Sequence, residues 1–355
     1  MKKIKLGKTC VGYDQPPYFI ADIGANHDGD IDRAFKLIEL AKEAGADAAK
    51  FQNFKANKIV SKVGFEKLGT QMIHQSKWKK SVFEVYKDAS LSDDWTKLLK
   101  EKCDKVGIEY FTSPYDFESV DLVDEFVDFY KIGSGDITWT EIIEHIASKN
   151  KPVIIATGAS DLEDVERAMS IISKKTREIV LMQCNTNYTT DINKHKYVNL
   201  NVLKTYAKNY PEVILGLSDH TFGHATVLGA ISLGARVIEK HFTDDNNRVG
   251  PDHKFAMNPH SWKEMIFNSK ILFESLGDGI KVIEENEKDS LVVQRRCIRA
   301  SRNLEAGHII KAEDFISLRP IPSDAIPPYK SKMIIGKELK VKILKGEHFT
   351  YKNFK

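Results

Sequence analysis

The feature that most constrains the fold of this chain is a regular alternation of short apolar runs with amphipathic stretches of helical period. Ala34, Leu37, Ile38 and Ala41, for example, recur at intervals of three and four residues, which places them on one face of a helix. Eight apolar runs predict strands: residues 18–23, 46–51, 108–111, 129–132, 152–156, 179–182, 213–216 and 236–239. Eight strands alternating with helices over about 260 residues predict an α/β fold, a (β/α)8 TIM barrel, with a doubly wound open sheet as the runner-up.

The pattern changes after about residue 277, where a charged helical stretch leads into a region of a different kind. Three short β-like pieces follow, separated by glycines and prolines: residues 297–300, 315–318 and 340–343. A domain of about sixty residues has a limited core, so we expect it to pack against its own barrel or a partner's. We expect three parts: a TIM-barrel catalytic domain (1–280), a linker (281–294) and a small, mostly β domain (295–355).

Composition narrows the class of protein. The 53 lysines and arginines nearly balance the 50 aspartates and glutamates, so the net charge of +3 predicts no basic surface for nucleic acid or an anionic membrane. No apolar run approaches the ~20 residues that cross a bilayer, and the N-terminus shows no secretory signal. Four scattered cysteines form no Cys-x-x-Cys pair, which argues against disulfides and a thiolate zinc site. We expect a cytoplasmic protein whose ligands are small molecules.

Polar side chains are concentrated where the predicted strands end, at the face of a barrel where active sites are built. Lys50 and Lys131 stand in otherwise apolar strands, where a lysine is costly unless it meets a buried carboxylate or an anionic ligand. Two lysines with Ser134 suit a phosphate plus a carboxylate, as in phosphoenolpyruvate or a phosphosugar. A single lysine could instead form a Schiff base, as in aldolases of the same architecture.

Two histidines, His220 and His241, end neighbouring predicted strands, the seventh and the eighth. Their imidazoles can reach one ion at the barrel mouth, and two imidazoles leave open positions for water and a substrate oxygen. Either histidine alone is better explained as a satisfied polar residue. With Asp219, Glu239 and Asp252 close in sequence, the pair admits a catalytic metal site beside that structural explanation.

Several motifs, taken together and in order, resemble the sialic acid synthase family. In the predicted barrel they are residues 21–29 (ADIGANHDG), 50–52 (KFQ), 130–135 (YKIGSG), 216–221 (GLSDHT), 238–243 (IEKHFT) and 250–253 (GPDH). The C-terminal part resembles that family's antifreeze-like (SAF) domain through residues 294–296 (QRR), 304–307 (LEAG), 318–320 (LRP) and 335–337 (IGK). The resemblance covers nearly the whole chain, so it is far more specific than any one motif.

The resemblance implies a metal-assisted synthase that condenses phosphoenolpyruvate with N-acetylmannosamine or a related amino sugar. Its products are an N-acetylneuraminate-type acid and phosphate, released by carbon–oxygen cleavage. The implied metal is Mn²⁺ or Mg²⁺, held by His220 and His241. The implied catalytic residues are these two histidines with Asp22, Lys50 and Lys131.

The same resemblance implies contacts for each substrate. For phosphoenolpyruvate they are Lys50, Thr112, Lys131, Ser134, Ser218 and Thr186. For the amino sugar they are Gln52, Tyr188, Asp252 and Arg319. Arg319 belongs to the SAF domain and in the family reaches the barrel mouth of the other subunit, which implies a domain-swapped homodimer.

The match to the family is incomplete, and other functions stay open. Asp22 stands where the family usually has glutamate, residues 183–188 depart from the usual sixth strand, and Ala156 replaces a frequent serine. These departures leave the identity of the acceptor sugar open. Alternatives are a legionaminic or pseudaminic acid synthase acting on a 2,4-diacetamido trideoxy sugar, a Schiff-base sialic acid aldolase, and a noncatalytic sugar-binding module.

Overall fold

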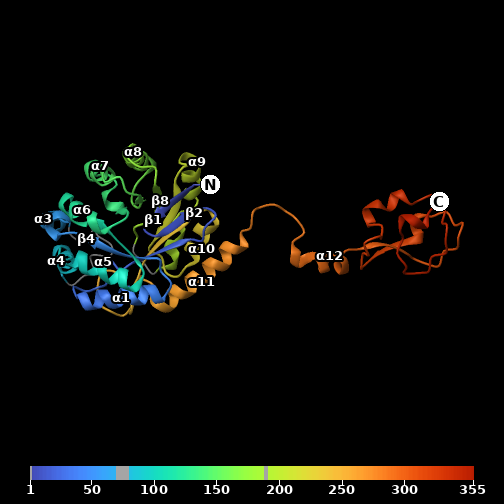
Figure 1. Cartoon of the computed structure of the whole chain (residues 1–355), viewed down its shortest axis with the longest axis horizontal. Helices are drawn as coiled ribbons and strands as arrows, with labels where there is room; N and C mark the ends of the chain where they lie inside the picture. Colours follow the sequence, from blue (N-terminus) through green and yellow to red (C-terminus); the bar gives the residue numbers. More distant parts are fainter. Residues whose placement is uncertain (1, 69–79, 188–190) are drawn as a thin grey trace. The chain divides into compact units, whose positions relative to one another are not determined.

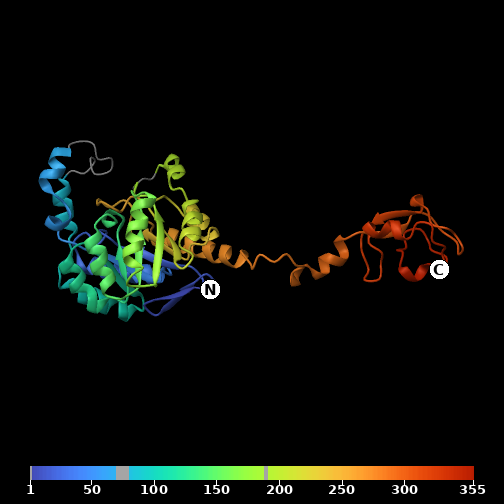
Figure 2. The ribbon, with the colours of Figure 1, turned by 90° about the horizontal axis from the view of Figure 1, so that it is seen from above.

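The computed structural model describes residues 2–68, 80–187 and 191–355. The chain divides into two compact units, Met1–Gly277 and Asp278–Lys355. In the first unit, eight parallel strands form a nearly closed barrel sheet that helices surround (Figure 1, Figure 2). Hydrogen-bonded neighbours follow the order β5-β4-β3-β10-β9-β8-β7-β6. The strands are β3 Tyr18–Asp22, β4 Ala48–Asn53, β5 Glu109–Pro114, β6 Tyr130–Ile132, β7 Val153–Ala156, β8 Ile179–Cys184, β9 Ile214–Asp219 and β10 Val237–His241. The predicted TIM barrel is confirmed.

Several strands extend further toward their carboxyl ends than the apolar runs do. The seventh run ends at residue 216, whereas β9 continues to Asp219, and β10 continues two residues beyond the eighth run to His241. Polar residues interrupt the apolar pattern but keep the parallel pairing, since His241 pairs with Asp22 and Cys184 pairs with Ser218. The polar strand ends are therefore held by the sheet, which fixes their side chains more precisely than a loop would.

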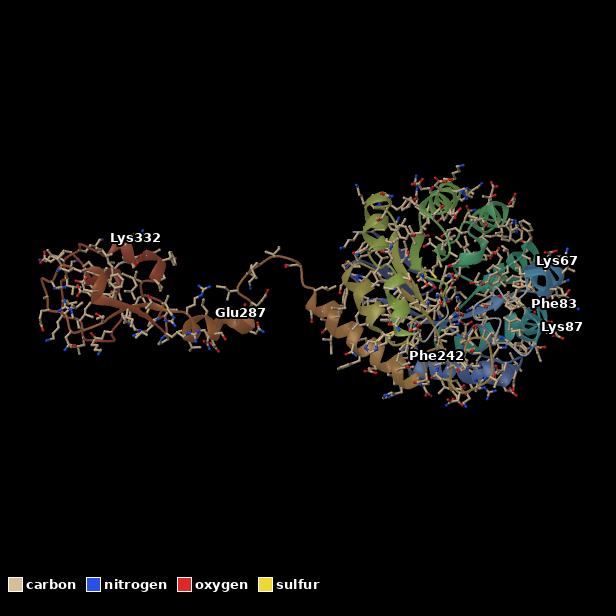
Figure 3. All side chains as sticks on the ribbon, turned by 180° about the vertical axis from the view of Figure 1, so that it is seen from behind. Lys67, Phe83, Lys87, Phe242, Glu287 and Lys332 are labelled. Atoms are coloured by element: carbon tan, nitrogen blue, oxygen red, sulfur yellow. The ribbon has the colours of Figure 1, made fainter. Side chains whose placement is uncertain are left out.

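Helices follow the strands and cover the outside of the barrel (Figure 1). They are α1 Ile31–Glu43, α5 Trp95–Val106, α6 Phe117–Val123, α7 Thr140–Ser148, α8 Leu162–Ile172, α9 Val202–Asn209, α10 Ala225–Ser232 and α11 Pro259–Ser275. The predicted apolar face of α1 is buried, and Asp30 caps this helix by accepting hydrogen bonds from two backbone N–H groups of its first turn. Phe242, labelled in Figure 3, packs edge-on against Trp262 of α11 with ring centroids 5.5 Å apart.

Other segments of the first unit were not anticipated from the apolar pattern. An antiparallel hairpin, β1 Lys3–Leu6 with β2 Thr9–Gly12, precedes the barrel and buries Ile4, Leu6 and Val11. The long connection between β4 and β5 holds α2 Ala56–Ile59, α3 Lys62–Leu68 and α4 Val82–Ala89. Short 3₁₀ helices are η3 Asp124–Phe126, η4 Ser134–Asp136 and η5 Ile192–Tyr197.

The second unit has a core of its own. Strands β11 Cys297–Ala300 and β12 Phe315–Leu318 form at the predicted positions and pair antiparallel. Residues 340–343 form no strand, because Ile343 makes only an isolated bridge with Leu304. The remaining elements are η6 Glu285–Glu287, α12 Lys288–Gln294, η7 Ala312–Asp314, η8 Pro328–Met333 and η9 Tyr351–Asn353. The core residues are Ile298, Ala300, Leu304, Ile310, Ile326, Ile334, Leu339, Ile343, Phe349 and Phe354.

Across the described residues of both units, the structure has no helix that combines the length and the apolar character of a membrane span.

Candidate active site

The pleat of β9 and β10 sorts their polar ends into two groups. Lys240 and Asp219 point away from the barrel interior and form a fully buried ion pair, with 2.6 Å between Nζ and Oδ2. Their neighbours Ser218, Glu239 and His241 point inward, because side chains alternate between the faces of a strand. The outward pair is structural, and the inward residues gather at the carboxyl end of the barrel.

Two lysines and two carboxylates form a continuous network of buried ion pairs inside the barrel. Lys50 Nζ lies 2.7 Å from Asp22 Oδ2 and 2.9 Å from Glu239 Oε1, and Lys131 Nζ lies 3.4 Å from the same oxygen of Glu239. Each of these four side chains is at most 5% exposed. Glu239, which the sequence suggested only as a neighbour of His220 and His241, therefore bridges the two lysines. Asp22 Oδ1 and Glu239 Oε2 have no hydrogen-bond partner among the described residues.

The site shifts the pKa values of the two lysines in opposite directions. Burial lowers the pKa of Lys50, but the charges of Asp22 and Glu239 outweigh burial and raise this pKa above its usual value. Burial lowers the pKa of Lys131, and the positive charge of Lys50 lowers it further, while Glu239 compensates only in part. Lys131 is therefore short of negative partners, and an anion beside it would stabilise its charge.

The ion pairs account for the burial of the two lysines but not for their position in the barrel. Both lysines do find a buried carboxylate, so pairing explains how they are tolerated in the barrel interior. Pairing does not explain why this network of ion pairs lies at the carboxyl end of the strands, where barrel enzymes act. The location, together with the unsatisfied oxygens, indicates a ligand site.

The two histidines lie side by side, with ring centroids 5.4 Å apart. His220 Nδ1 is 3.0 Å from the carbonyl oxygen of Asn185, which assigns the ring proton to Nδ1 and the lone pair to Nε2. Burial, and then the nearby His241, lower the pKa of His220, so its imidazole is neutral at neutral pH. A neutral ring that donates through Nδ1 is the form that coordinates a metal through Nε2.

A metal at this position would have an incomplete set of protein ligands. His241 lies 3.7 Å from Asp22 Oδ2 and 3.8 Å from Asp252 Oδ2. Within residues 2–68, 80–187 and 191–355, no group of three or more histidine, cysteine, aspartate or glutamate side chains is arranged as a metal site. Two imidazoles with room for water or substrate oxygens nevertheless fit a catalytic site, in which open positions are required.

A second group of small polar residues surrounds Gly158 after β7. The Ser134 hydroxyl accepts a hydrogen bond of 2.9 Å from the Gly158 backbone N–H. A β-carbon at residue 158 would lie 2.4 Å from Thr186 Cγ2 and 3.0 Å from Cys184 Sγ, so only glycine fits. Ser134 and Thr186, both predicted phosphate ligands, are thus brought together.

The structure places the side chain of Thr112, a predicted phosphoenolpyruvate contact, away from the barrel interior. This residue pairs with Phe51, whose neighbour Lys50 points inward, so Thr112 points outward; its hydroxyl donates to Asn53 at 2.7 Å. The next residue, Ser113, pairs with Gln52 and points inward, and its buried hydroxyl has no partner among the described residues. Ser113 is therefore the candidate that the sequence missed. Apolar periodicity could not decide between them, because the choice depends on the strand register.

The remaining predicted contacts lie in different places. Gln52 is half-buried on β4, and Asp252 lies in the loop after β10, 3.5 Å from the backbone nitrogen of Ala25. Tyr188 lies outside the described residues. Arg319 belongs to the second unit, where it is exposed.

The sequence also matches two family models. The model of the NeuB family matches residues 37–281, and the model of the SAF domain matches residues 295–355. This chain belongs to the NeuB family. The resemblance inferred from the motifs is confirmed, and so is the C-terminal SAF domain.

NeuB-family relatives span nearly the whole chain. An N,N'-diacetyllegionaminic acid synthase from Legionella pneumophila is 36% identical over 335 residues, which are 93% of this chain and 92% of the relative. The human N-acetylneuraminate-9-phosphate synthase is 28% identical and covers 94% of this chain and 91% of its own length. A solved N-acetylneuraminic acid synthetase from Leptospira borgpetersenii superimposes with a TM-score of 0.71 at 28% identity, over 82% of this chain and 95% of that protein.

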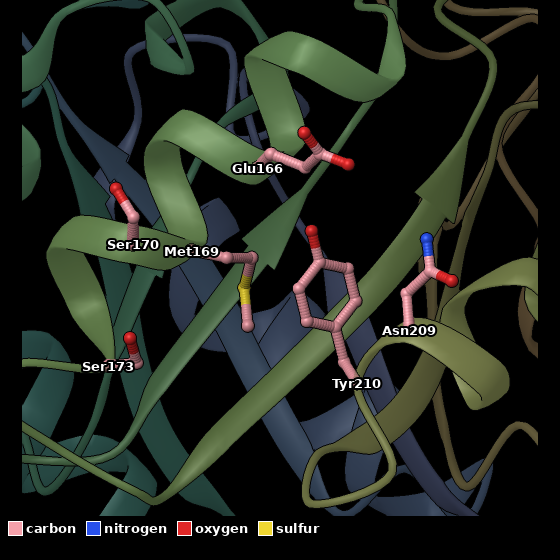
Figure 4. Close-up of a pocket in the computed structure, with 6 residues that line it drawn as sticks. All are labelled: Glu166, Met169, Ser170, Ser173, Asn209 and Tyr210. Atoms are coloured by element: carbon pink, nitrogen blue, oxygen red, sulfur yellow. The ribbon is translucent and has the colours of Figure 1, made fainter.

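A cavity of about 550 Å³ lies elsewhere, between α8 and the end of α9 (Figure 4). Its lining residues are Glu166, Met169, Ser170, Ser173, Asn209 and Tyr210. None of the candidate active-site residues of this NeuB-family barrel borders it, so the cavity adds nothing to the site.

Gly24 offers a test of how tightly the site is packed. Its φ is +50°, and a β-carbon there would lie 3.2 Å from Asp252 Oδ2 and 3.4 Å from His241 Cε1. Gly24→Ala is expected to lower kcat/KM at least about ten-fold, since displacements near 1 Å cost up to two orders of magnitude. Gly107→Ala is the matched control, because its φ is +77° but no described atom lies within 4 Å of the added carbon. Each variant is expected to lose about 1 kcal/mol of stability; equal activity in both would contradict this packing.

Proposed function

We propose that this NeuB-family chain is a nonulosonic acid synthase. It condenses phosphoenolpyruvate with N-acetylmannosamine or a related N-acyl amino sugar, giving an N-acetylneuraminate-type acid and phosphate. The observation that carries the proposal is the network of buried ion pairs in which Glu239 links Lys50 and Lys131. This network lies beside His220 and His241 at the carboxyl end of the barrel.

The lysines supply the binding site for phosphoenolpyruvate. This substrate carries a carboxylate and a phosphate, and two lysines with small polar groups match that pair of anions. The anionic ligand stabilises the charge of Lys131 more than that of Lys50, because burial lowers the pKa of Lys131 and Glu239 only partly offsets that effect. Ser134, the Gly158 loop and the inward hydroxyl of Ser113 provide further hydrogen bonds.

The reaction joins two carbon atoms and then releases phosphate. C3 of phosphoenolpyruvate attacks the aldehyde carbon of the open-chain sugar, and positive charge develops at C2. Water adds to C2, and the proton that it loses balances the one that the former aldehyde oxygen takes up. The C2 hydroxyl then becomes the ketone as the bond between C2 and the bridging oxygen breaks, so that this oxygen and the hydroxyl proton leave with phosphate. A divalent metal, Mn²⁺ or Mg²⁺, bound by His220 and His241 would supply Lewis acidity toward the aldehyde oxygen.

The carboxylates of the site position the acceptor and move protons. Asp22 accepts from Lys50 through Oδ2, while its Oδ1 is left for a substrate hydroxyl or a water. Asp22 is therefore the residue that orients the sugar or shuttles its proton. Its side chain is one methylene shorter than the glutamate usual in the family, so contact through a bound water fits it better.

A second candidate acceptor is a 2,4-diacetamido trideoxy sugar. Two N,N'-diacetyllegionaminic acid synthases, from Legionella pneumophila and Campylobacter jejuni, are 36% and 34% identical to this chain. The human N-acetylneuraminate-9-phosphate synthase is 28% identical, and two pseudaminic acid synthases are 30% identical. These identities favour the legionaminic acceptor as the alternative to N-acetylmannosamine.

The proposed enzyme is a domain-swapped homodimer in which Arg319 completes the acceptor site of the partner barrel. Arg319→Ala and Lys131→Met are each expected to be nearly inactive alone. Random mixing after dissociation gives heterodimers that hold one intact site, and activity is expected to return to about a quarter of the wild-type value. Phosphate release by the mixture checks this, and no recovery in a mixture with demonstrated subunit exchange would contradict the swap.

The proposed reaction is tested with protein stripped of metal and resupplied with Mn²⁺. Phosphoenolpyruvate is offered with N-acetylmannosamine, its 6-phosphate, or 2,4-diacetamido-2,4,6-trideoxymannose, and phosphate release is measured. Metal-dependent release with one acceptor supports the synthase and names its sugar. Covalent trapping of pyruvate by borohydride, without such release, would instead indicate a Schiff-base aldolase.

A further inference from the structure

The loop between β10 and α11, residues 242–258, carries Asp252 to the proposed active site. Asp252 Oδ2 lies 3.8 Å from His241 Nδ1, and it is held only weakly, at 3.5 Å, by the backbone nitrogen of Ala25. The residue that follows, His253, is entirely buried. The proposed reaction gives His253 no role, so its burial and its contacts need an explanation.

The contacts of His253 define both its tautomer and its partners. Nε2 lies 2.9 Å from Asp28 Oδ1, and Nδ1 lies 2.7 Å from the hydroxyl of Thr243. Burial raises the pKa of Asp28, but hydrogen bonds from His253 and Arg248 outweigh burial and lower it, so Asp28 is ionised. Nε2–H therefore donates to Asp28, and Nδ1 accepts from Thr243.

Asp28 belongs to a different loop, residues 23–30, which begins directly after Asp22. The other oxygen of Asp28 lies 2.8 Å from Arg248 of loop 242–258 and 3.2 Å from Arg33. The Asn26 amide adds a third link between the loops by donating to the Phe242 carbonyl oxygen at 2.9 Å. The bond between Asp28 and His253 is the part of this connection that lies directly beside Asp252, and we call it the Asp28–His253 clamp.

We infer that His253 is a positioning residue for the acceptor sugar: through the Asp28–His253 clamp it holds loop 242–258 so that the Asp252 carboxylate faces the acceptor. The inference rests on the proposed function, in which Asp252 contacts the amino sugar. Because His253 adjoins Asp252 in the chain, loss of the clamp displaces that carboxylate directly. A displacement near 1 Å is costly at a reacting site, but the lysines that bind phosphoenolpyruvate belong to other strands. The clamp therefore affects the acceptor and not phosphoenolpyruvate.

Two substitutions of similar polarity separate the clamp from a general packing role. In His253→Gln the amide nitrogen reaches the position of Nε2 and keeps the donor to Asp28, whereas in His253→Asn the shorter side chain keeps only the contact with Thr243. His253→Asn is expected to raise the KM for the acceptor about ten-fold or more, with the KM for phosphoenolpyruvate unchanged. His253→Gln is expected to restore the acceptor KM to within about three-fold of the wild-type value.

His145→Asn is the matched control. His145 Nε2 of α7 lies 2.8 Å from Asp121 Oδ1 of α6, so the same kind of contact is lost between two outer helices and not within loop 242–258. Neither KM is expected to change in this variant. An unchanged acceptor KM in His253→Asn, or an equal rise in both KM values, would overturn the clamp while leaving the reaction in place.

A second measurement is independent of turnover. Amide hydrogen exchange within residues 242–258 is expected to quicken in His253→Asn but not in His253→Gln or His145→Asn. If the wild-type protein turns over no acceptor, the proposed function fails, and the role of the clamp toward the acceptor falls with it. Unchanged exchange in His253→Asn overturns the clamp even where the wild-type protein is an active synthase.

Discussion

Lys131→Met is expected to lower kcat/KM for phosphoenolpyruvate by about 10²- to 10³-fold while the barrel stays folded. Removing one member of a buried, charge-assisted contact costs about 2–5 kcal/mol, and each 1.4 kcal/mol is a factor of ten. The substitution costs the folded protein little stability, because burial and the charge of Lys50 already disfavour the charged form of Lys131. Glu239 also keeps its ion pair with Lys50. Steady-state kinetics and a thermal melt on the same sample check both parts.

Lys240→Met is the matched control for this prediction. Lys240 is as deeply buried as Lys131, but its partner Asp219 lies outside the barrel interior. Loss of Lys240 leaves Asp219 buried without its cation, which costs about 3–5 kcal/mol and lowers the melting temperature by roughly 6 °C or more. A destabilised Lys131→Met with unimpaired kcat/KM would show that Lys131 is a structural lysine like Lys240.

His220→Ala and His241→Ala are each expected to reduce kcat by about 10³-fold or more, since the Lewis acid they would hold is worth several kcal/mol to the transition state. Neither substitution removes a strand hydrogen bond, so circular dichroism and the melting temperature should stay close to those of the wild-type protein. Mn²⁺ binding, measured by titration calorimetry, should weaken in parallel with the loss of activity.

His224→Ala serves as the control for the two histidine variants. His224 contacts Asn268 of α11 at 3.2 Å on the outside of the barrel, and its loss should leave both Mn²⁺ binding and kcat unchanged. Substantial activity in His220→Ala or His241→Ala at saturating Mn²⁺ would contradict the assignment of these residues to the metal.

The barrel was predictable because its parallel strands are buried on both faces and therefore appear as short apolar runs. The same criterion failed at the strand ends, where residues such as Ser218 and His241 continue the sheet although they are polar. It also missed the N-terminal hairpin, where buried residues such as Ile4 and Leu6 alternate with lysines and form no apolar run. Residues 340–343 show the opposite error: an apolar alternation without a neighbouring strand to pair with.

The candidate site was predictable in its residue types but not in its connections. Lys50, Lys131 and the two histidines were recognisable because ionisable residues are rare in buried strands. The role of Glu239 as the carboxylate shared by both lysines depends on which strands are neighbours, and the choice of Ser113 over Thr112 depends on register. Neither is a property of a single segment, so both required the assembled sheet.

The proposed enzyme joins phosphoenolpyruvate to an amino sugar with cleavage of the carbon–oxygen bond. The most direct test uses phosphoenolpyruvate labelled with heavy oxygen at the bridging position, together with Mn²⁺ and the acceptor that turns over, and mass spectrometry of both products. The label is expected in phosphate, and the sugar product is expected to have the combined mass of the acceptor and pyruvic acid. Label retained by the organic product, or no such product with any acceptor, would contradict this reaction.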